Sequence, residues 1–193
     1  MIGFVTDSSS QLPPELARRY GIEVVPITVV VDGTPYEEGV DLDVDELYAA
    51  YADGPPEVST AHPSPGRMAE AYRAAVERGA TEILSIHVAA DLSGTLNSAR
   101  LAADDVPVPV RLVDTGTASF GVAACLWEAA EVVCGGGSAD HAAEVAERVA
   151  ASIGTVFVVQ APDLAPGRGR LPAGVASTTE WAAVRPRLIA SPC

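Results

Sequence analysis

The stretch EILSIHVAADLSGT, residues 82–95, contains a strand, a short polar loop and the beginning of a helix. Residues 82–88 are centred on Ile and Leu and have the length of a strand buried in a parallel sheet. The loop ends at Gly94, and we expect a helix over 94–103. Parallel neighbouring strands need a crossover connection of this kind, which is usually a helix. This stretch therefore predicts one unit of an α/β fold.

The same alternation extends along the chain. We expect strands at 2–6, 24–31, 34–36, 57–60, 82–88, 110–114 and 155–160. With their flanking caps, the expected helices cover 13–21, 43–51, 64–79, 94–103, 119–134 and 138–152. Asp32-Gly33 is typical of a two-residue hairpin turn, which makes 34–36 an edge strand. The chain is therefore predicted to form a Rossmann-like parallel sheet with helices on both faces.

The tail of the chain differs from the rest. Residues 1–152 are predicted to form one α/β domain. After the strand at 155–160, the residues from 161 onward are rich in Pro and Gly, with a short helix expected near 176–184 and a strand at 186–190. We expect 153–193 to form an incomplete second α/β lobe. A half-built lobe exposes apolar surface, which favours a homodimer, instability or a shallower site.

Composition limits the partners. The formal net charge is −14 and the sequence pI is about 4.4, so the surface repels nucleic acid and anionic membranes. An anionic ligand can bind here only through local hydrogen-bond donors. The N-terminus lacks a basic segment followed by an apolar one, and the most apolar run, 24–31, is too short to span a bilayer. A cytoplasmic location is expected.

The cysteines and histidines show no metal or redox motif. Cys125 and Cys134 are nine residues apart on one expected helix, so they face opposite sides and do not bridge. There is no CxxC pair, and we interpret the cysteines as free thiols. The three histidines, His62, His87 and His141, have no metal-ligand spacing. We expect no metal and no cofactor.

Three hydroxyl-rich segments each lie between the end of a strand and the start of a helix: 6–10, 59–64 and 92–95. In open parallel sheets, ligands bind outside the carboxyl ends of the strands, where helix N-termini also favour negative charge. Each segment alone is explained by helix capping. Thr60 and Ser93 precede the expected caps, which leaves their hydroxyls free to donate to an oxyanion.

The polar residues at the strand ends allow other interpretations. Asp7 is interpreted as organising its turn rather than as a metal ligand or general base. His87 is interpreted as a core group with satisfied hydrogen bonds. The segment around Ser93 is not the G-x-S-x-G elbow of a hydrolase. The run 135–137 follows a helix, so it is not a phosphate loop. The loop at 167–170 is either a solvated loop or a basic loop at the mouth of a site.

Several of these motifs, in this order, resemble the DegV family. They are VTDSS at 5–9, TAHPS at 60–64, LSIH at 84–87, LSGT with SA at 92–95 and 98–99, and VDT with Ser119 and Gly121 near 113–121. The resemblance covers roughly residues 1–160. Ala61 and His62 stand where the family usually has Ser and Gln. The chain ends at Cys193, where the family would continue with the rest of a second domain.

The resemblance implies a two-domain protein that binds a long-chain fatty acid and is not itself an enzyme. It implies that Thr60 and Ser93 hydrogen-bond the carboxylate, and that a separate fatty acid kinase is a partner of some members. Further ligand contacts are expected from residues near these two: Ser8, His62, Gly94, Thr95 and Arg170. Two alternatives stay open: a phosphotransferase-like or hydrolase-like enzyme that uses the same crevice, and a degenerate fragment that binds nothing.

Overall fold

The computed structural model describes residues 1–42, 44–50, 54 and 56–154. Within them the chain forms one compact unit that begins at Met1. Four predictions lie outside the described residues: the strand at 155–160, the helix near 176–184, the strand at 186–190 and Arg170. The second lobe, predicted for 153–193, therefore stays a prediction.

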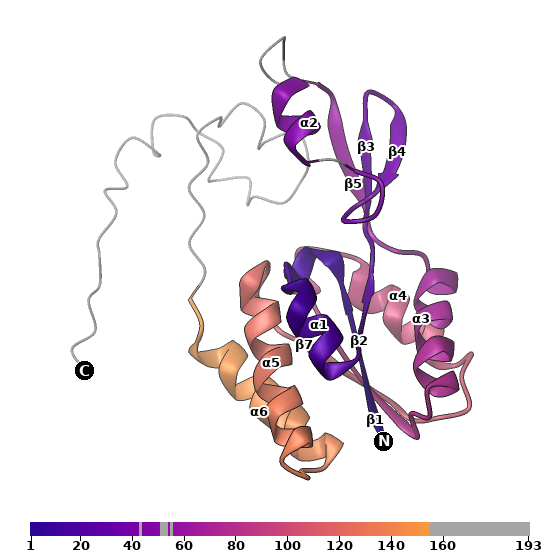
Figure 1. The fold of residues 1–193 in the computed structure, drawn as a ribbon, viewed down its shortest axis with the longest axis vertical. Helices are drawn as coiled ribbons and strands as arrows, with labels where there is room; N and C mark the ends of the chain where they lie inside the picture. Colours follow the sequence, from indigo (N-terminus) through magenta and orange to yellow (C-terminus); the bar gives the residue numbers. More distant parts are fainter. Residues whose placement is uncertain (43, 51–53, 55, 155–193) are drawn as a thin grey trace, which may run out of the picture. The chain divides into compact units, whose positions relative to one another are not determined.

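The main sheet has four parallel strands in the order β2-β1-β6-β7 (Figure 1). Their bounds are β1 Ile2–Asp7, β2 Ile22–Val25, β6 Glu82–His87 and β7 Val110–Asp114. The strand β1 lies in the middle, where residues 3–7 are all buried. Because all four strands run in one direction, their carboxyl ends share one edge of the sheet. The predicted parallel α/β architecture is confirmed.

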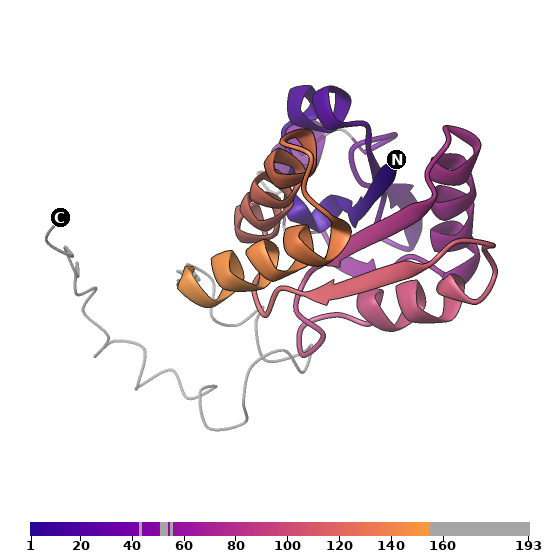
Figure 2. The same cartoon turned by 90° about the horizontal axis from the view of Figure 1, so that it is seen from below.

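Helices cover both faces of this sheet, as predicted (Figure 2). Their bounds are α1 Pro14–Tyr20, α3 Pro65–Glu77, α4 Thr95–Ala103, α5 Phe120–Cys134 and α6 Ala139–Ser152. One face packs Val5 and Ile83 against Met68, Tyr72 and Ala99 of α3 and α4. The other face packs Phe4, Leu84 and Val113 against the Ala-rich faces of α5 and α6. Small alanines let these helices approach the β-branched sheet closely.

A second, antiparallel sheet in the order β4-β3-β5 was not predicted. It contains β3 Thr28–Val31, β4 Thr34–Glu37 and β5 Val58–Ala61, and α2 Val44–Ala50 lies between β4 and β5 in the sequence. The expected single strand 24–31 is wrong. It divides at Pro26, which has no N–H to donate to a ladder and restricts the residue before it. Val25 therefore ends a strand of the main sheet, and Thr28 begins a strand of the other.

Local signals for turns and caps are confirmed. Asp32 and Gly33 both have positive φ, as a two-residue hairpin turn requires. Ser64 and Ser138 each cap a helix by accepting a hydrogen bond from the backbone N–H three residues later. The two helical cysteines differ as predicted: Cys125 is buried and Cys134 is exposed.

Candidate functional site

The strands β1 and β6 are neighbours, and their last residues are Asp7 and His87. Both side chains are fully buried, and His87 Nδ1 lies 2.8 Å from Asp7 Oδ2. Asp7 also caps the short 3-10 turn Ser8–Ser10 by accepting a hydrogen bond from the N–H of Ser9 at 3.1 Å. The interpretation of Asp7 as a residue that organises its turn is confirmed. Its carboxylate is used on both oxygens inside the chain.

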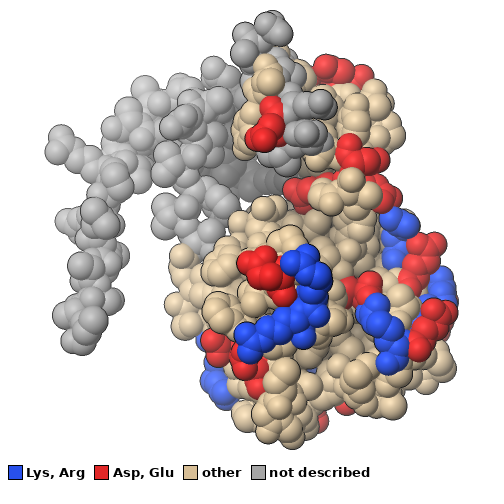
Figure 3. Space-filling view, in the orientation of Figure 1, with Lys and Arg blue, Asp and Glu red and all other residues tan. Residues whose placement is uncertain are grey.

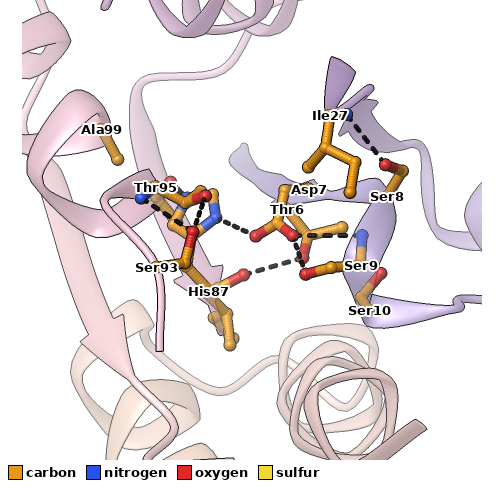
Figure 4. Close-up of polar contacts among 12 residues, drawn as sticks. Thr6, Asp7, Ser8, Ser9, Ser10, Ile27, His87, Ser93, Thr95 and Ala99 are labelled. Carbon is orange, nitrogen blue, oxygen red and sulfur yellow. Dashed lines mark hydrogen bonds and ion pairs between the residues drawn. The ribbon is translucent and has the colours of Figure 1, made fainter. Parts of the chain in front are cut away.

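His87 belongs to a longer buried chain of hydrogen bonds (Figure 4). Its Nε2 lies 2.6 Å from Ser85 Oγ, and Ser85 Oγ lies 2.9 Å from Tyr72 Oη. Tyr72 donates to the carbonyl of Ala99 at 3.3 Å. The interpretation of His87 as a satisfied core group is confirmed, but its partners were not foreseen. Ser85 and His87 are two residues apart on one strand face, which is the sequence signal that could have paired them.

Burial and pairing act in opposite directions on the groups of this chain. Burial tends to raise the pKa of Asp7, but its hydrogen bond and charge attraction to His87, together with bonds from Ser9, lower the pKa below its ordinary value. Burial raises the pKa of Tyr72 to about 12, against a smaller lowering by Ser85. Asp7 is therefore ionised and Tyr72 is protonated at neutral pH.

Asp7, His87 and Ser85 have the residue types of a hydrolase triad. A nucleophilic serine must reach a substrate carbonyl and have an oxyanion site beside it. Ser85 lies in the middle of β6 with no exposed surface, and its hydroxyl contacts Tyr72. This arrangement does not give the serine access to a substrate, so we assign the three residues to the interior of the fold.

Ser8 is placed at the junction of the two sheets. Its hydroxyl accepts a hydrogen bond from the N–H of Ile27 at 2.9 Å and donates to Glu38 Oε2 at 2.6 Å. Ile27 lies in the link between β2 and β3, and Glu38 directly follows β4. The hydroxyl predicted as an additional ligand contact is thus engaged inside the chain.

Ser93 and Thr95 lie in the loop that begins α4. Ser93 Oγ lies 2.8 Å from Thr95 Oγ1 and accepts a longer bond, 3.3 Å, from the N–H of Thr95. A serine hydroxyl has one hydrogen to donate and two lone pairs that accept. With Thr95 supplying both hydrogens, Ser93 keeps its own hydrogen for a ligand. In Figure 4 this loop is drawn on the opposite side of His87 from Ser8, Ser9 and Ser10.

His62 joins the loop after β5 to the loop before α4. A Cβ built on Gly94 would lie 2.8 Å from His62 Cε1, 2.9 Å from Nδ1 and 3.0 Å from Nε2. The ring therefore occupies the space that a side chain at 94 would need, and it is otherwise exposed. Thr60, two residues before His62, has an exposed side chain on β5 and pairs with Val29. Two of the three hydroxyl-rich segments thus meet at this contact.

The loop after β6 is also held from β7. Asp114 accepts hydrogen bonds from the N–H groups of Ala90 and Gly116 at 3.3 and 3.0 Å. Thr115 donates its hydroxyl to the carbonyl of His87 at 2.8 Å. These bonds fix the path of the chain between the end of β6 and Ser93. The acidic group at 114 is therefore part of the support of the loop.

The charged surface shows no concentration of positive charge. On the face in Figure 3, basic groups lie beside acidic groups. The printed ion pairs are Arg19 with Glu131, Arg67 with Glu37 and Glu70, Arg78 with Glu23, and Arg111 with Asp140 and Glu147. A ligand anion at the strand ends would thus depend on hydroxyl, amide and imidazole donors.

Two searches of the described residues gave no candidates. No three His, Cys, Asp or Glu side chains gather there as a metal ion would require. Among the helices between residues 1 and 154 that the structure describes, none has both the length and the apolar character needed to cross a bilayer.

The fold and these loops define an α/β protein with a candidate ligand site at the carboxyl edge of its parallel sheet. A family model described as "Uncharacterised protein, DegV family COG1307" matches residues 1–190. The chain belongs to the DegV family. A DegV domain-containing protein of Streptomyces coelicolor is 40% identical over 187 residues, which are 97% of this chain and 66% of the relative. One from Deinococcus radiodurans is 38% identical over 88% of this chain and 60% of its own length.

Solved structures agree with the fold. A Thermus thermophilus structure, described as fatty acid binding of a DegV family protein, matches with a TM-score of 0.72 and 37% identity. The match covers 78% of this chain and 53% of that one. A stearic acid-binding protein from Eubacterium ventriosum matches with a TM-score of 0.68 and 28% identity, over 74% of this chain and 50% of that one. This chain thus spans between half and two thirds of the relatives it matches.

Proposed function

We propose that this chain binds a long-chain fatty acid and holds its carboxylate with the hydroxyls of Thr60 and Ser93. The observation that carries the proposal is the contact between His62 and Gly94, which brings the segments of Thr60 and Ser93 together. The Thermus structure, which shares 37% identity with this chain, is described as fatty acid binding. Its similarity extends over the part of this chain that contains both segments.

The hydrogen-bond arrangement of the loop suits a carboxylate. A carboxylate that leaves water is costly unless several donors reach it. Ser93 has a hydrogen to donate, since Thr95 fills its acceptor positions. The exposed ring nitrogens of His62 supply a further donor beside it. Neutral donors of this kind avoid the need for a basic patch, which the acidic surface does not offer.

The acyl chain supplies most of the affinity in this proposal. Each buried CH2 contributes ~0.8 kcal/mol, so a fully buried palmitate tail contributes on the order of 10 kcal/mol before association costs. We infer that residues 153–193 begin the lobe that covers this tail, with Arg170 near its mouth. As a binding protein of the cytoplasm, the chain would present the bound acid to a separate kinase rather than act on it.

The contacts of Asp7 argue against the enzymatic alternative. A phosphotransferase-like or hydrolase-like site would need Asp7, Ser93 and His62 to act together on a small substrate. Both oxygens of Asp7 already accept hydrogen bonds from buried or backbone partners. We therefore favour binding without chemistry.

Mass spectrometry of the full chain purified from cells tests the proposal. Under denaturing conditions the protein should release a C14–C18 fatty acid, and the Ser93→Ala variant should retain less. Ser152→Ala is the matched control, because its hydroxyl donates to the carbonyl of Val149 on α6, outside the candidate site. A folded protein that carries no lipid and binds no added palmitate would contradict the proposal and favour the degenerate alternative.

A further inference from the structure

The buried chain of hydrogen bonds between Asp7 and Ala99 has an acceptor at each end. Asp7 Oδ2 accepts at one end, and the carbonyl of Ala99 accepts at the other. Three side chains lie between them: His87, Ser85 and Tyr72. They form four links, of 2.8, 2.6, 2.9 and 3.3 Å. Each link needs one hydrogen.

Counting hydrogens shows that the usual protonation states do not fill this chain. A neutral His87 brings one N–H, and Ser85 and Tyr72 bring one O–H each. That gives three hydrogens for four links, so one pair of acceptors would face each other without a hydrogen between them. A buried polar atom left in that state is costly. One additional proton fills every link.

The additional proton also sets a direction along the chain. With it, His87 donates to Asp7 and to Ser85, Ser85 donates to Tyr72, and Tyr72 donates to Ala99. We propose that this chain holds an imidazolium at His87 and that, in this state, it is the positioning unit for the ligand site. The inference rests on the proposed function for what it positions, but the proton count depends on the contacts alone.

The lowered pKa of Asp7 agrees with this location of the proton, because it keeps the carboxylate ionised. The other elements around His87 bring no competing charge. In β7, Asp114 is its register partner, but that carboxylate is exposed and accepts from Ala90 and Gly116. From α3 it meets Tyr72 through Ser85. The first turns of α4 and α5 contain no acidic residue.

The chain connects the elements that carry the candidate site. Asp7 ends β1, before the turn that contains Ser8. Tyr72 lies on α3, the helix that follows His62, and Ala99 lies on α4, the helix that follows Ser93. The three loops are therefore tied to one another from beneath. With the additional proton, the Asp7–His87 pair is neutral overall, so the buried carboxylate does not repel a ligand carboxylate.

Removing one hydroxyl should remove the need for the additional proton. In Tyr72→Phe, Ser85 no longer has to donate to residue 72 and can donate to His87 Nε2 instead. A neutral His87 then fills both remaining links. The variant should lose the imidazolium at a lower pH than the parent, by about half a unit to one unit. Tyr20→Phe is the control, since Tyr20 bonds Glu131 at the surface, away from this chain.

Long-range 1H–15N NMR of the full chain from pH 5 to 9 tests the inference, with His87→Asn used to assign the signals. The parent should show both His87 nitrogens protonated at neutral pH, and Tyr72→Phe should show the change to a neutral ring at lower pH. A neutral ring in the parent at neutral pH, or an unchanged midpoint in Tyr72→Phe, would overturn it. If Tyr72→Phe does not fold, the parent spectrum at neutral pH still decides.

A ligand titration separates this inference from the proposed function. Palmitate retention by the parent should fall on the alkaline side of the NMR transition, and it should fall at lower pH in Tyr72→Phe. Hexadecanol, which carries no charge, should show no such shift. Failure of palmitate to bind at any pH, with the NMR result intact, would contradict fatty acid binding and leave the imidazolium supported. Palmitate binding without any pH shift between the variants would overturn the positioning role.

Discussion

The ring of His62 lies against the Cα of Gly94, at the point where the loop after β5 meets the N-terminus of α4. Neither residue is held there by a hydrogen bond that the structure prints between them. The contact depends on the absence of a side chain at 94, because all the ring atoms nearest an added Cβ would lie within 3.0 Å of it. The distance between the segments of Thr60 and Ser93 therefore depends on a glycine.

Gly94→Ala should displace His62 and weaken ligand binding with little effect on stability. The φ of Gly94 is −73°, which alanine adopts readily, so the contact itself is what changes. The exposed ring can swing away, and we expect palmitate affinity to fall about tenfold or more. In the double variant His62→Ala/Gly94→Ala the clash is gone. If isothermal titration shows equal affinity for Gly94→Ala and the parent, the contact does not shape the site.

Ser8 and Ser93 should respond in opposite ways to removal of their hydroxyls. Ser8→Ala leaves the N–H of Ile27 and the carboxylate of Glu38 without their partner, so we expect a loss of about 1–2 kcal/mol in the free energy of unfolding. Ligand retention at low temperature should change little. Ser93→Ala should lower retention and leave stability nearly unchanged. Urea unfolding and lipid extraction measure the two effects, and the reverse pattern would make Ser8 the ligand contact.

Asp7→Asn should flatten the dependence of stability on pH in acid. The pKa of Asp7 is lowered in the folded protein, so its contribution is present above the ordinary value of 3.8 and is lost as pH falls through the folded value. The variant also breaks the buried pair with His87, which costs about 3–5 kcal/mol at neutral pH. Urea unfolding at several pH values between 3 and 7 should therefore give a steeper curve for the parent. Parallel curves would show that Asp7 does not titrate with folding.

Much of the fold follows from local signals in the sequence. Ser64 and Ser138 predict helix starts because a capping hydroxyl needs only residues three positions away. Asp32-Gly33 predicts a hairpin for the same reason. Pro26 also carried a local signal, since it cannot donate to a ladder. That signal was outweighed by the β-branched residues around it, and the run 24–31 was expected as one strand.

The contacts that shape the candidate site are not local. Asp7 and His87 are separated by 80 residues, and they meet only because β1 and β6 are neighbours in the sheet. Strand order does not follow from a single sequence, so a buried Asp–His pair could not be assigned. His62 and Gly94 likewise meet through two loops of different sheets. The residue types at the strand ends were predictable, whereas their partners required the topology.

Packing of β1 against α3 leads to the last prediction. A Cβ on Gly3 would lie 3.0 Å from Ala80 Cβ and 3.2 Å from Ala75 Cβ, which are tighter than ordinary contacts. Gly3→Ala should therefore destabilise the fold by about 1–3 kcal/mol, because neither short neighbour can rotate away. Gly66→Ala is the matched control in the first turn of α3, where the nearest atom, Ser64 Oγ, is 3.8 Å from the added Cβ. There the loss of backbone freedom in the unfolded chain should give a neutral or stabilising change. Equal thermal unfolding midpoints for the two variants would show that α3 can shift away from the sheet, and the core at Gly3 would then be less tightly packed than its distances indicate.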